Sequence, residues 1–313
     1  MSRPLAHRFL RRALEGPSNA TLAAGMALTS VVVALAVFGP ALAPLDPEAY
    51  VRILRDEAGT WRTAPFAPFD VQGYPLGTDY DGRDILSRLL GAFRPTLIMA
   101  ASAATVRLML GIVVGASAGW LRGRAGRLVG GVLQAAAAVP LLMVAVGVLY
   151  ALGGSYGMVH FVAALSLTGW ASTALIVAGI VAGIRNQAFI EAARASGAGE
   201  AAIVRRHVVP MLVALLPMRL AFEIGASLLA LGELGFLGFL LGGGATRSVA
   251  RGDSSGAWQV MIAGQPDLAQ MLSGGWQNFY QTPWLAVWGG GAFFVAVLAF
   301  MLLGEGLRGR LSS

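Results

Sequence analysis

Residues 96–119 read TLIMAASAATVRLMLGIVVGASAG, an apolar run in which Arg107 is the one charged residue. An α-helix crosses the roughly 30 Å core of a bilayer with about 20 such residues. Similar segments lie at about 21–43, 128–152, 158–182, 212–241 and 284–304. Backbone polar groups must be satisfied internally in lipid, so each segment is expected to be helical. The sequence therefore predicts an all-α integral membrane protein with six transmembrane helices.

The composition excludes several classes of site. The chain is 56% hydrophobic and 12% charged, all 23 basic residues are arginine, and cysteine is absent. Without lysine there is no G-x-x-x-x-G-K-[ST] loop to bind ATP phosphates. Without cysteine there is no disulfide, no Cys-ligated zinc and no iron–sulfur cluster. His7, His160 and His207 lie far apart, so we predict no catalytic residue, no metal site and no cofactor bound by this chain.

The arginines indicate which side of the membrane each connection occupies. With the N-terminus inside, the inner pieces are 1–20, 120–127, 183–211 and 305–313, and the outer pieces are 44–95 and 242–283. The inner pieces hold thirteen arginines and four acids, and the outer pieces hold eight arginines and ten acids. An arginine excess marks cytoplasmic loops. We therefore expect both termini in the cytoplasm, and the net charge of +7 requires no nucleic-acid partner.

The first apolar segment has a second interpretation as a signal peptide. Arg8, Arg11 and Arg12 precede it, and Ala41-Leu42-Ala43 resembles a cleavage site. The segment is longer than the 7–15 apolar residues of such a peptide, and Pro44 would follow the cut. A retained helix over 21–43 is therefore the expectation.

Local signals predict where the helices break. Pro140, Pro210 and Pro217 are expected to kink or bound helices, which neighbouring helices in a bundle tolerate. The glycine- and serine-rich stretch 242–256 shows no strong helix or strand signal and is expected to be a mobile loop. No internal repeat, as many secondary transporters have, is detectable.

The inner connection at 185–210 is the most informative one. It predicts a short helix over about 189–196, ended by Gly197, because glycine readily adopts the left-handed cap conformation. A second short helix is expected to run up to Pro210. Small alanines on the first helix would allow close approach to a groove on a partner. The alternative is an ordinary basic connection between two spans.

These residues resemble the EAA loop of importer-type ABC permeases. The pattern there is E-A-A, three residues, G, nine residues, then I-x-L-P. Its positions are matched here by Glu191, Ala192, Ala193, Gly197 and Pro210. His207 and Val209 replace the isoleucine and leucine, and this ending is similar to the peptide-transporter branch.

Two other regions resemble the C-type permease of the dipeptide/oligopeptide/nickel family. Residues 76–88 read LGTDYDGRDILSR, similar to that family's LGTD-x-x-GRD-x-x-SR stretch. Near the end, PWLA at 283–286, VLAF at 297–300 and LGEGLR at 303–308 resemble its final helix. The three matches occur in the family's order along most of the chain.

The resemblance implies a type I importer-like permease fold in a bacterial or archaeal cytoplasmic (inner) membrane. The tail 1–20 and the helix 21–43 would precede an external loop, 44–95, that contains the LGTD stretch. A five-helix permease core would occupy 96–304, with the EAA loop at 185–210, an external loop at 242–283 and a cytoplasmic tail at 305–313. The implied partners are a second, B-type permease, two ATP-binding subunits that hold ATP and Mg²⁺, an external solute-binding protein, and the lipid bilayer.

The acidic run 79–84 also resembles a calcium loop, but Arg83 occupies a ligand position and Leu90 stands where the bidentate glutamate belongs. Helix capping is the preferred interpretation. Thr78, Asp79 or Asp84 would cap a surface helix over about 84–93.

Four charges fall inside apolar segments, where each costs about 2.5–3.5 kcal/mol or more. They are Arg107, Arg219, Glu223 and Glu233. Arg219 and Glu223 are expected to pair across one helical turn. Arg107 is expected to pair with Glu233, with Glu223 as the alternative mate. Pairing within the bundle and lining a substrate path are both open.

The function expected is therefore the permease subunit of an ATP-driven importer, most simply for di- or oligopeptides. Nickel, glutathione and oligosaccharides are alternative substrates. An ion-coupled secondary transporter that uses Arg107 and Glu233 as a relay is the alternative from another class, but such a carrier has no need of an ATPase-docking loop.

The predicted topology is tested by cysteine labelling, because the native chain has no cysteine. A cysteine at Ser254 should react with a membrane-impermeant thiol reagent added outside, and a cysteine at Ser196 should react only after the membrane is permeabilised. The reverse pattern would overturn the predicted orientation.

Overall fold

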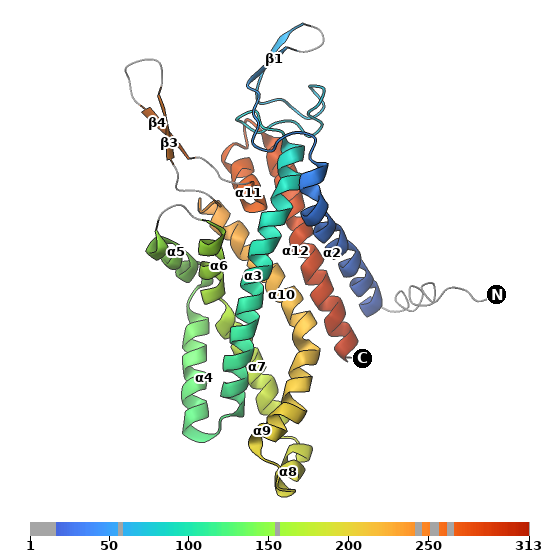
Figure 1. Ribbon diagram of the computed structural model, residues 1–313, viewed down its shortest axis with the longest axis vertical. Coiled ribbons are helices and arrows are strands. Elements are labelled where there is room, and N and C mark those ends of the chain that lie inside the picture. Colours follow the sequence, from blue (N-terminus) through green and yellow to red (C-terminus); the bar gives the residue numbers. More distant parts are fainter. Residues whose placement is uncertain are drawn as a thin grey trace, which may run out of the picture.

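A computed structural model describes residues 17–55, 59–153, 157–241, 246–250, 257–261 and 266–312. The long helices are α2 (Pro17–Leu42), α3 (Ile85–Trp120), α10 (Val209–Phe236) and α12 (Pro283–Ser312). The shorter ones are α4 (Gly123–Ala138), α5 (Leu141–Leu152), α6 (Met158–Leu167), α7 (Trp170–Arg185), α8 (Ala188–Ala195), α9 (Glu200–Ile203) and α11 (Leu268–Gln277), with a π-helical turn, η1, at Val204–Val208. Together they form an elongated helical bundle (Figure 1).

Among the described residues, four helices are long and apolar enough to cross a membrane. They are Asn19–Leu42, Ile85–Trp120, Glu200–Phe236 and Pro283–Leu311. Two bent pairs, α4 with α5 and α6 with α7, raise the number to six if each pair is one span. The mostly helical membrane architecture predicted from the sequence is confirmed at this level.

The predicted single helices at 128–152 and 158–182 are each broken. The chain bends by 80° between α4 and α5 and by 41° between α6 and α7. Pro140 precedes the first residue of α5 and has no N–H to continue α4. Gly169, at a φ of +70°, precedes α7, a left-handed conformation that favours glycine. The first break follows the proline prediction, whereas the second was not predicted.

The helix expected at 84–93 is not a separate surface helix. It is the first part of α3, whose 36 residues span about 54 Å. Pro95 lies inside this helix and removes one backbone hydrogen bond without ending it. The second short helix expected before Pro210 is likewise continuous, because α9, η1 and α10 form one run from Glu200 to Phe236.

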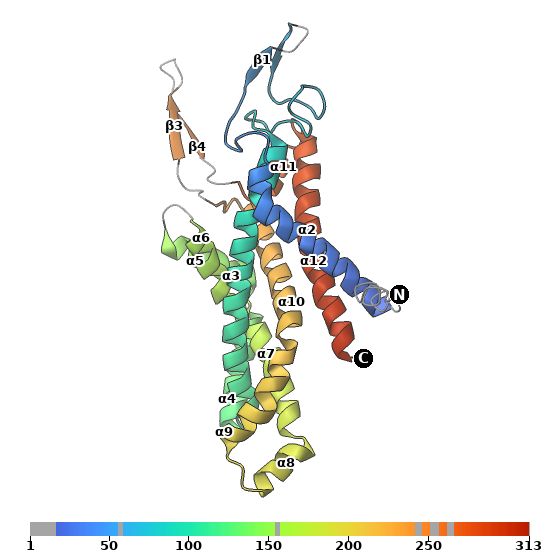
Figure 2. The same ribbon diagram turned by 45° about the vertical axis from the view of Figure 1, so that its right-hand side comes forward.

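Small residues let the long helices approach closely. Ala100, Ala103 and Ala104 of α3 are fully buried in the main core, together with Leu228 and Leu231 of α10. In lipid, where apolar surface is already satisfied, such close packing is a main source of helix association. Helix α2 packs along α12 (Figure 2).

The end of the molecule opposite α8 carries irregular chain and two antiparallel hairpins (Figure 1). Strands β1 (Ile53–Arg55) and β2 (Trp61–Thr63) pair Leu54 with Arg62. Strands β3 (Thr246–Ala250) and β4 (Ala257–Met261) form the second hairpin. The sequence predicted no strand in 242–256, so β3 is a correction, and the rest of that stretch, with Ser254, lies outside the described residues. Helix α8 lies at the opposite end (Figure 1).

The packing of α2 on α12 is testable at one glycine. A Cβ on Gly306 would overlap the backbone of Leu22, whereas a Cβ on Gly291 of the same helix would meet nothing within 4 Å. Gly306→Ala should therefore lower the free energy of unfolding by about 1–3 kcal/mol, seen as a lower melting temperature of the purified protein. Gly291→Ala is the matched control, and equal melting temperatures for the two variants would contradict this packing.

Candidate functional site

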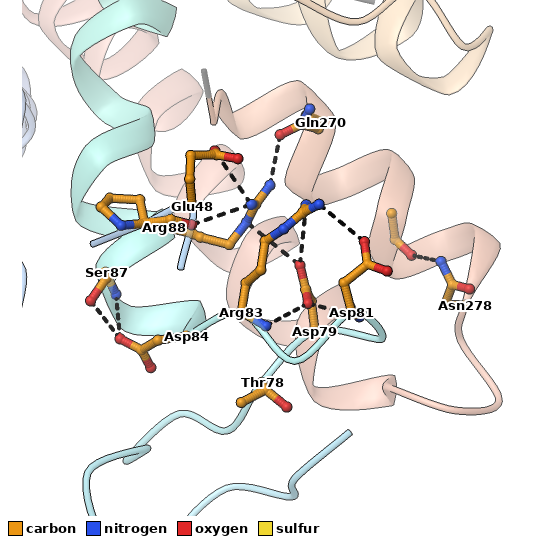
Figure 3. Close-up of polar contacts among 12 residues, drawn as sticks. Glu48, Thr78, Asp79, Asp81, Arg83, Asp84, Ser87, Arg88, Gln270 and Asn278 are labelled. Carbon is orange, nitrogen blue, oxygen red and sulfur yellow. Dashed lines mark hydrogen bonds and ion pairs between the residues drawn. The ribbon is translucent and has the colours of Figure 1, made fainter. Parts of the chain in front are cut away.

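Polar side chains at the N-terminal end of α3 organise the stretch around residues 77–88. Asp79 Oδ1 accepts hydrogen bonds from the backbone N–H groups of Asp81 and Arg83, both at 2.9 Å. Asp84 caps α3 and accepts from the Ser87 N–H at 2.8 Å. Of the three proposed capping residues, Asp84 is therefore the cap, whereas Asp79 shapes the turn before it (Figure 3).

Arg88 joins this turn to helix α11. Its Nη2 donates to Gln270 Oε1 at 2.8 Å, and its Nε lies 3.7 Å from Asp79 Oδ2. Glu48 approaches the same guanidinium at 3.7 Å (Figure 3). Burial raises the pKa of the Asp79 carboxyl above its ordinary value, while Arg88 and Arg83 act in the opposite direction. These contacts attach Glu48 and the turn at Asp79 to α3 and α11.

Asp267 completes the attachment of α11. It is buried and caps the helix by accepting from the Gln270 N–H at 2.9 Å. Burial raises the pKa of this carboxyl to about 6, although backbone hydrogen bonds from Gln270, Ala269 and Leu241 lower it. Asp267 thereby ties α11 to the chain that follows α10.

A second polar cluster is buried among the spans. Arg107 Nε of α3 lies 3.4 Å from Glu223 Oε2 of α10, and Arg219 Nη2 lies 3.6 Å from Glu223 Oε1. Thr173 of α7 donates a hydrogen bond to Glu223. Arg107 Nη1 donates to Ser227 Oγ at 3.1 Å. One carboxylate thus connects three helices in the apolar interior.

The expected pairing of Arg107 with Glu233 is wrong. Glu233 is exposed on α10, whereas Glu223, the alternative mate, contacts Arg107. The expected pairing of Arg219 with Glu223 is confirmed. Sequence reasoning missed Thr173 and Ser227. Their signal is a small polar residue in an apolar span, which is common where helices pack and therefore weak by itself.

At the opposite end, α8 is a short helix with a well-defined stop. Gly197 has a φ of +85°, and its N–H donates to the Arg194 carbonyl at 3.0 Å. The Ala198 N–H donates to the Ala193 carbonyl at 3.1 Å. These two bonds form a Schellman cap, so the predicted helix end at Gly197 is confirmed.

One face of α8 is anchored and the other is free within this chain. Ile190 is fully buried in a cluster with Ile184 of α7 and Ile203 of α9. Glu191 and Ala192 are exposed. Ala193 is half-buried and packs against the same cluster. Of the two alanines in the E-A-A pattern, Ala192 is therefore the exposed one, whereas Ala193 lies on the side of α8 that packs with Ile190.

Arginines connect α8 and its flanks to the end of α3. Arg185 Nη1 donates to the carbonyls of Gly119, Trp120 and Leu121 at 2.9, 3.2 and 2.6 Å. Arg194 lies over the Trp120 ring at 5.5 Å and bonds Glu200 at 2.7 Å. None of these contacts was predicted, and those to the end of α3 join segments more than 60 residues apart.

Pro210 is exposed on the second residue of α10, directly after η1. Because proline has no N–H, the carbonyl four residues earlier loses its usual donor. The chain widens instead into a π-type turn, in which the Val209 N–H donates to the Val204 carbonyl. Pro210 therefore shapes the entry to α10 without separating two helices.

The described residues contain no group of three or more His, Cys, Asp or Glu side chains placed to hold a metal ion. The described polar features are thus the contacts of Arg88 with Asp79 and Gln270, the buried ion pairs of Glu223, and the anchored helix α8.

The family described as binding-protein-dependent transport system inner membrane component matches residues 111–305. The chain belongs to this family. The matched residues include α8 and both bent pairs.

Individual relatives extend the similarity over most of the chain. The glutathione transport system permease protein GsiD of Pectobacterium atrosepticum is 29% identical, covering 96% of this chain and 87% of that protein. The nickel transport system permease protein NikC of Escherichia coli is 30% identical, covering 86% and 85%. The di/tripeptide transport system permease protein DppC of Pseudomonas aeruginosa is 28% identical, covering 91% and 85%. This inner membrane component is a permease of the ABC-importer class.

The buried pair in this permease is testable by a double-mutant cycle. Glu223→Leu should cost about 3–5 kcal/mol, because it leaves Arg107 and Arg219 buried without a carboxylate. Arg107→Leu should cost less, because Glu223 keeps Arg219 as its partner. The double variant should recover part of the folded yield in detergent. Glu233→Leu, at an exposed position of the same helix, is the control and should have little effect. Additive losses from the first two substitutions would show that the pair does not couple α3 to α10.

Proposed function

We propose that this permease forms half of the passage of an ATP-driven importer. The other half is a second, B-type permease, two separate subunits bind and hydrolyse ATP with Mg²⁺, and an external binding protein delivers the solute. Both bent pairs count as spans in this proposal, which gives six spans with both termini cytoplasmic. The support is family membership together with the arginine excess in the inner connections.

The observation that carries the proposal is the build of α8. Glu191 and Ala192 lie on the exposed face of α8. The opposite face is anchored in the chain by the buried side chain of Ile190. A helix that is exposed on one side and anchored on the other can transmit a push without deforming. The small side chain of Ala192 permits a close approach of an ATPase subunit.

The contacts behind α8 explain how such a push reaches the spans. Arg185 attaches the end of α7 to the last carbonyls of α3, and Arg194 contacts Trp120 at the end of the same helix. Ile203 links the cluster to the run that becomes α10. Closure of the ATPases on α8 would therefore move α3, α7 and α10 together and shift the passage between inward- and outward-facing states.

Peptides are the substrate class that we propose. Of the three relatives, one is named for di- and tripeptides and one for glutathione, itself a tripeptide. Nickel is the alternative, from the third name. The proposal of a secondary transporter with an Arg107–Glu233 relay loses its basis, because these two residues are not partners.

The coupling role is tested at Ala192 in the complete complex in proteoliposomes. Ala192→Trp adds a large side chain to the exposed face, so it should lower peptide-stimulated ATP hydrolysis and uptake at least about tenfold, the effect of losing some 1.4 kcal/mol of contact. The variant should retain its melting temperature and membrane insertion, since Ala192 has no packing inside the chain.

Two controls sharpen this test. Leu311→Trp changes an exposed residue at the end of α12, which ends well short of α8 (Figure 1), and should leave coupling unchanged. Ala193→Trp should lower the melting temperature as well, because Ala193 packs inward. Wild-type peptide-stimulated transport by the Ala192→Trp complex would contradict the assignment of α8.

A further inference from the structure

The two helix breaks enclose a cavity that family membership does not explain. A cavity of about 290 Å³ lies between the break at Val139–Pro140 and the break at Thr168–Gly169, and Arg107 forms part of its wall. Arg107 is 13 positions from Trp120 along α3, or about 20 Å. The cavity therefore lies deep in the apolar part of the protein.

The charge beside this cavity is not balanced. Arg107 and Arg219 share the single carboxylate of Glu223, so the cluster has one excess positive charge. The Arg107 side chain is only 4% exposed. Its Nε lies 3.4 Å from Glu223 Oε2, and among the described residues neither of these two atoms has a hydrogen-bond partner. A buried cation without full compensation is costly, and a bound anion would remove that cost.

The guanidinium reaches the wall of the cavity at Gly169. A side chain on Gly169 would overlap Arg107 Nη2, so the absence of a Cβ there gives the guanidinium its place beside the break. The left-handed φ of Gly169 makes glycine the suitable residue for the turn as well.

Two helices begin at the same cavity. Leu141 and Val144, in the first turn of α5, and Trp170 and Ser172, in the first turn of α7, line it. Neither N-terminus has a side-chain cap. The N–H groups of Trp170 and Met143 donate to backbone carbonyls, and each helix end still carries a partial positive charge. Broken helices in transporters direct such ends at anionic groups of the substrate. Helix ends and Arg107 thus favour the same kind of ligand.

We propose that this cavity binds the carboxylate of a peptide during its passage. This inference rests on the proposed function, since it takes peptides as the solute. A carboxylate supplies the missing negative charge and two acceptors for the guanidinium and the helix N–H groups. A cationic group would be repelled, and a neutral amide would leave the excess charge in place.

The test compares a peptide with its C-terminal amide, each at saturating concentration, in proteoliposomes that contain the complete complex and its binding protein. The variant Arg107→Gln removes the cation beside the cavity and leaves Arg219 paired with Glu223, so the remaining cluster is neutral and the protein should still fold. Relative to wild type, its acid-to-amide uptake ratio should fall by about tenfold or more, the value of one charge-assisted hydrogen bond. Arg122→Gln, at an exposed arginine after the end of α3, should leave the ratio unchanged.

A second measurement does not depend on removing Arg107. Ala137 lines the cavity, and Ala137→Cys places the only cysteine in this chain. During turnover, the free-acid peptide should slow its reaction with a small neutral maleimide more than the amide does. Equal labelling rates, or an unchanged uptake ratio in the folded Arg107→Gln variant, would overturn the carboxylate site and leave the importer intact. ATP-driven uptake of neither peptide by the wild-type complex would overturn the proposed function and this inference with it.

Discussion

The carboxylate of Glu223 is the point on which the arrangement of the spans depends. It contacts Arg107 of α3, Arg219 of its own helix and Thr173 of α7. Lipid offers no water to replace any of these contacts, so separating the three helices would leave charges exposed to hydrocarbon. Small residues on α3 then bring the backbones close enough for dispersion forces to add to the ion pairs.

Helix α3 is held at both ends by arginine. Arg88 fixes its N-terminal end to the Asp79 turn and to α11, and Arg185 binds the carbonyls at its C-terminal end. Between these attachments the helix is continuous for about 54 Å. A continuous helix of this length connects the region of α8 at one end of the molecule with the Asp79 turn and α11 at the other. The LGTD stretch, which lies outside the matched family range, therefore acts through α3 as a structural clamp.

The two broken helices introduce polar backbone where continuous helices would have none. Such backbone is tolerated at membrane depth when it faces protein or a cavity. Here both breaks face the cavity at Arg107. The same Glu223 cluster thus has two consequences, because it holds the bundle together and leaves one positive charge beside this cavity.

Features that depend on local chemistry could be predicted from the amino-acid sequence. The length of the apolar segments indicated membrane helices, and Pro140 indicated a break in one of them. Gly197 indicated the end of α8. The spacing of the E-A-A pattern indicated the family. The carboxylate that contacts Arg107 could be identified only from the tertiary structure. Glu223 and Glu233 both lie on α10, and the contact depends on which face of α10 packs against α3. The tertiary structure likewise decided that Ala193 packs inward, since that orientation depends on Ile184 and Ile203 from other segments. Periodicity gives the spacing of side chains along a helix, whereas its rotation and depth are set by the partners against which it packs.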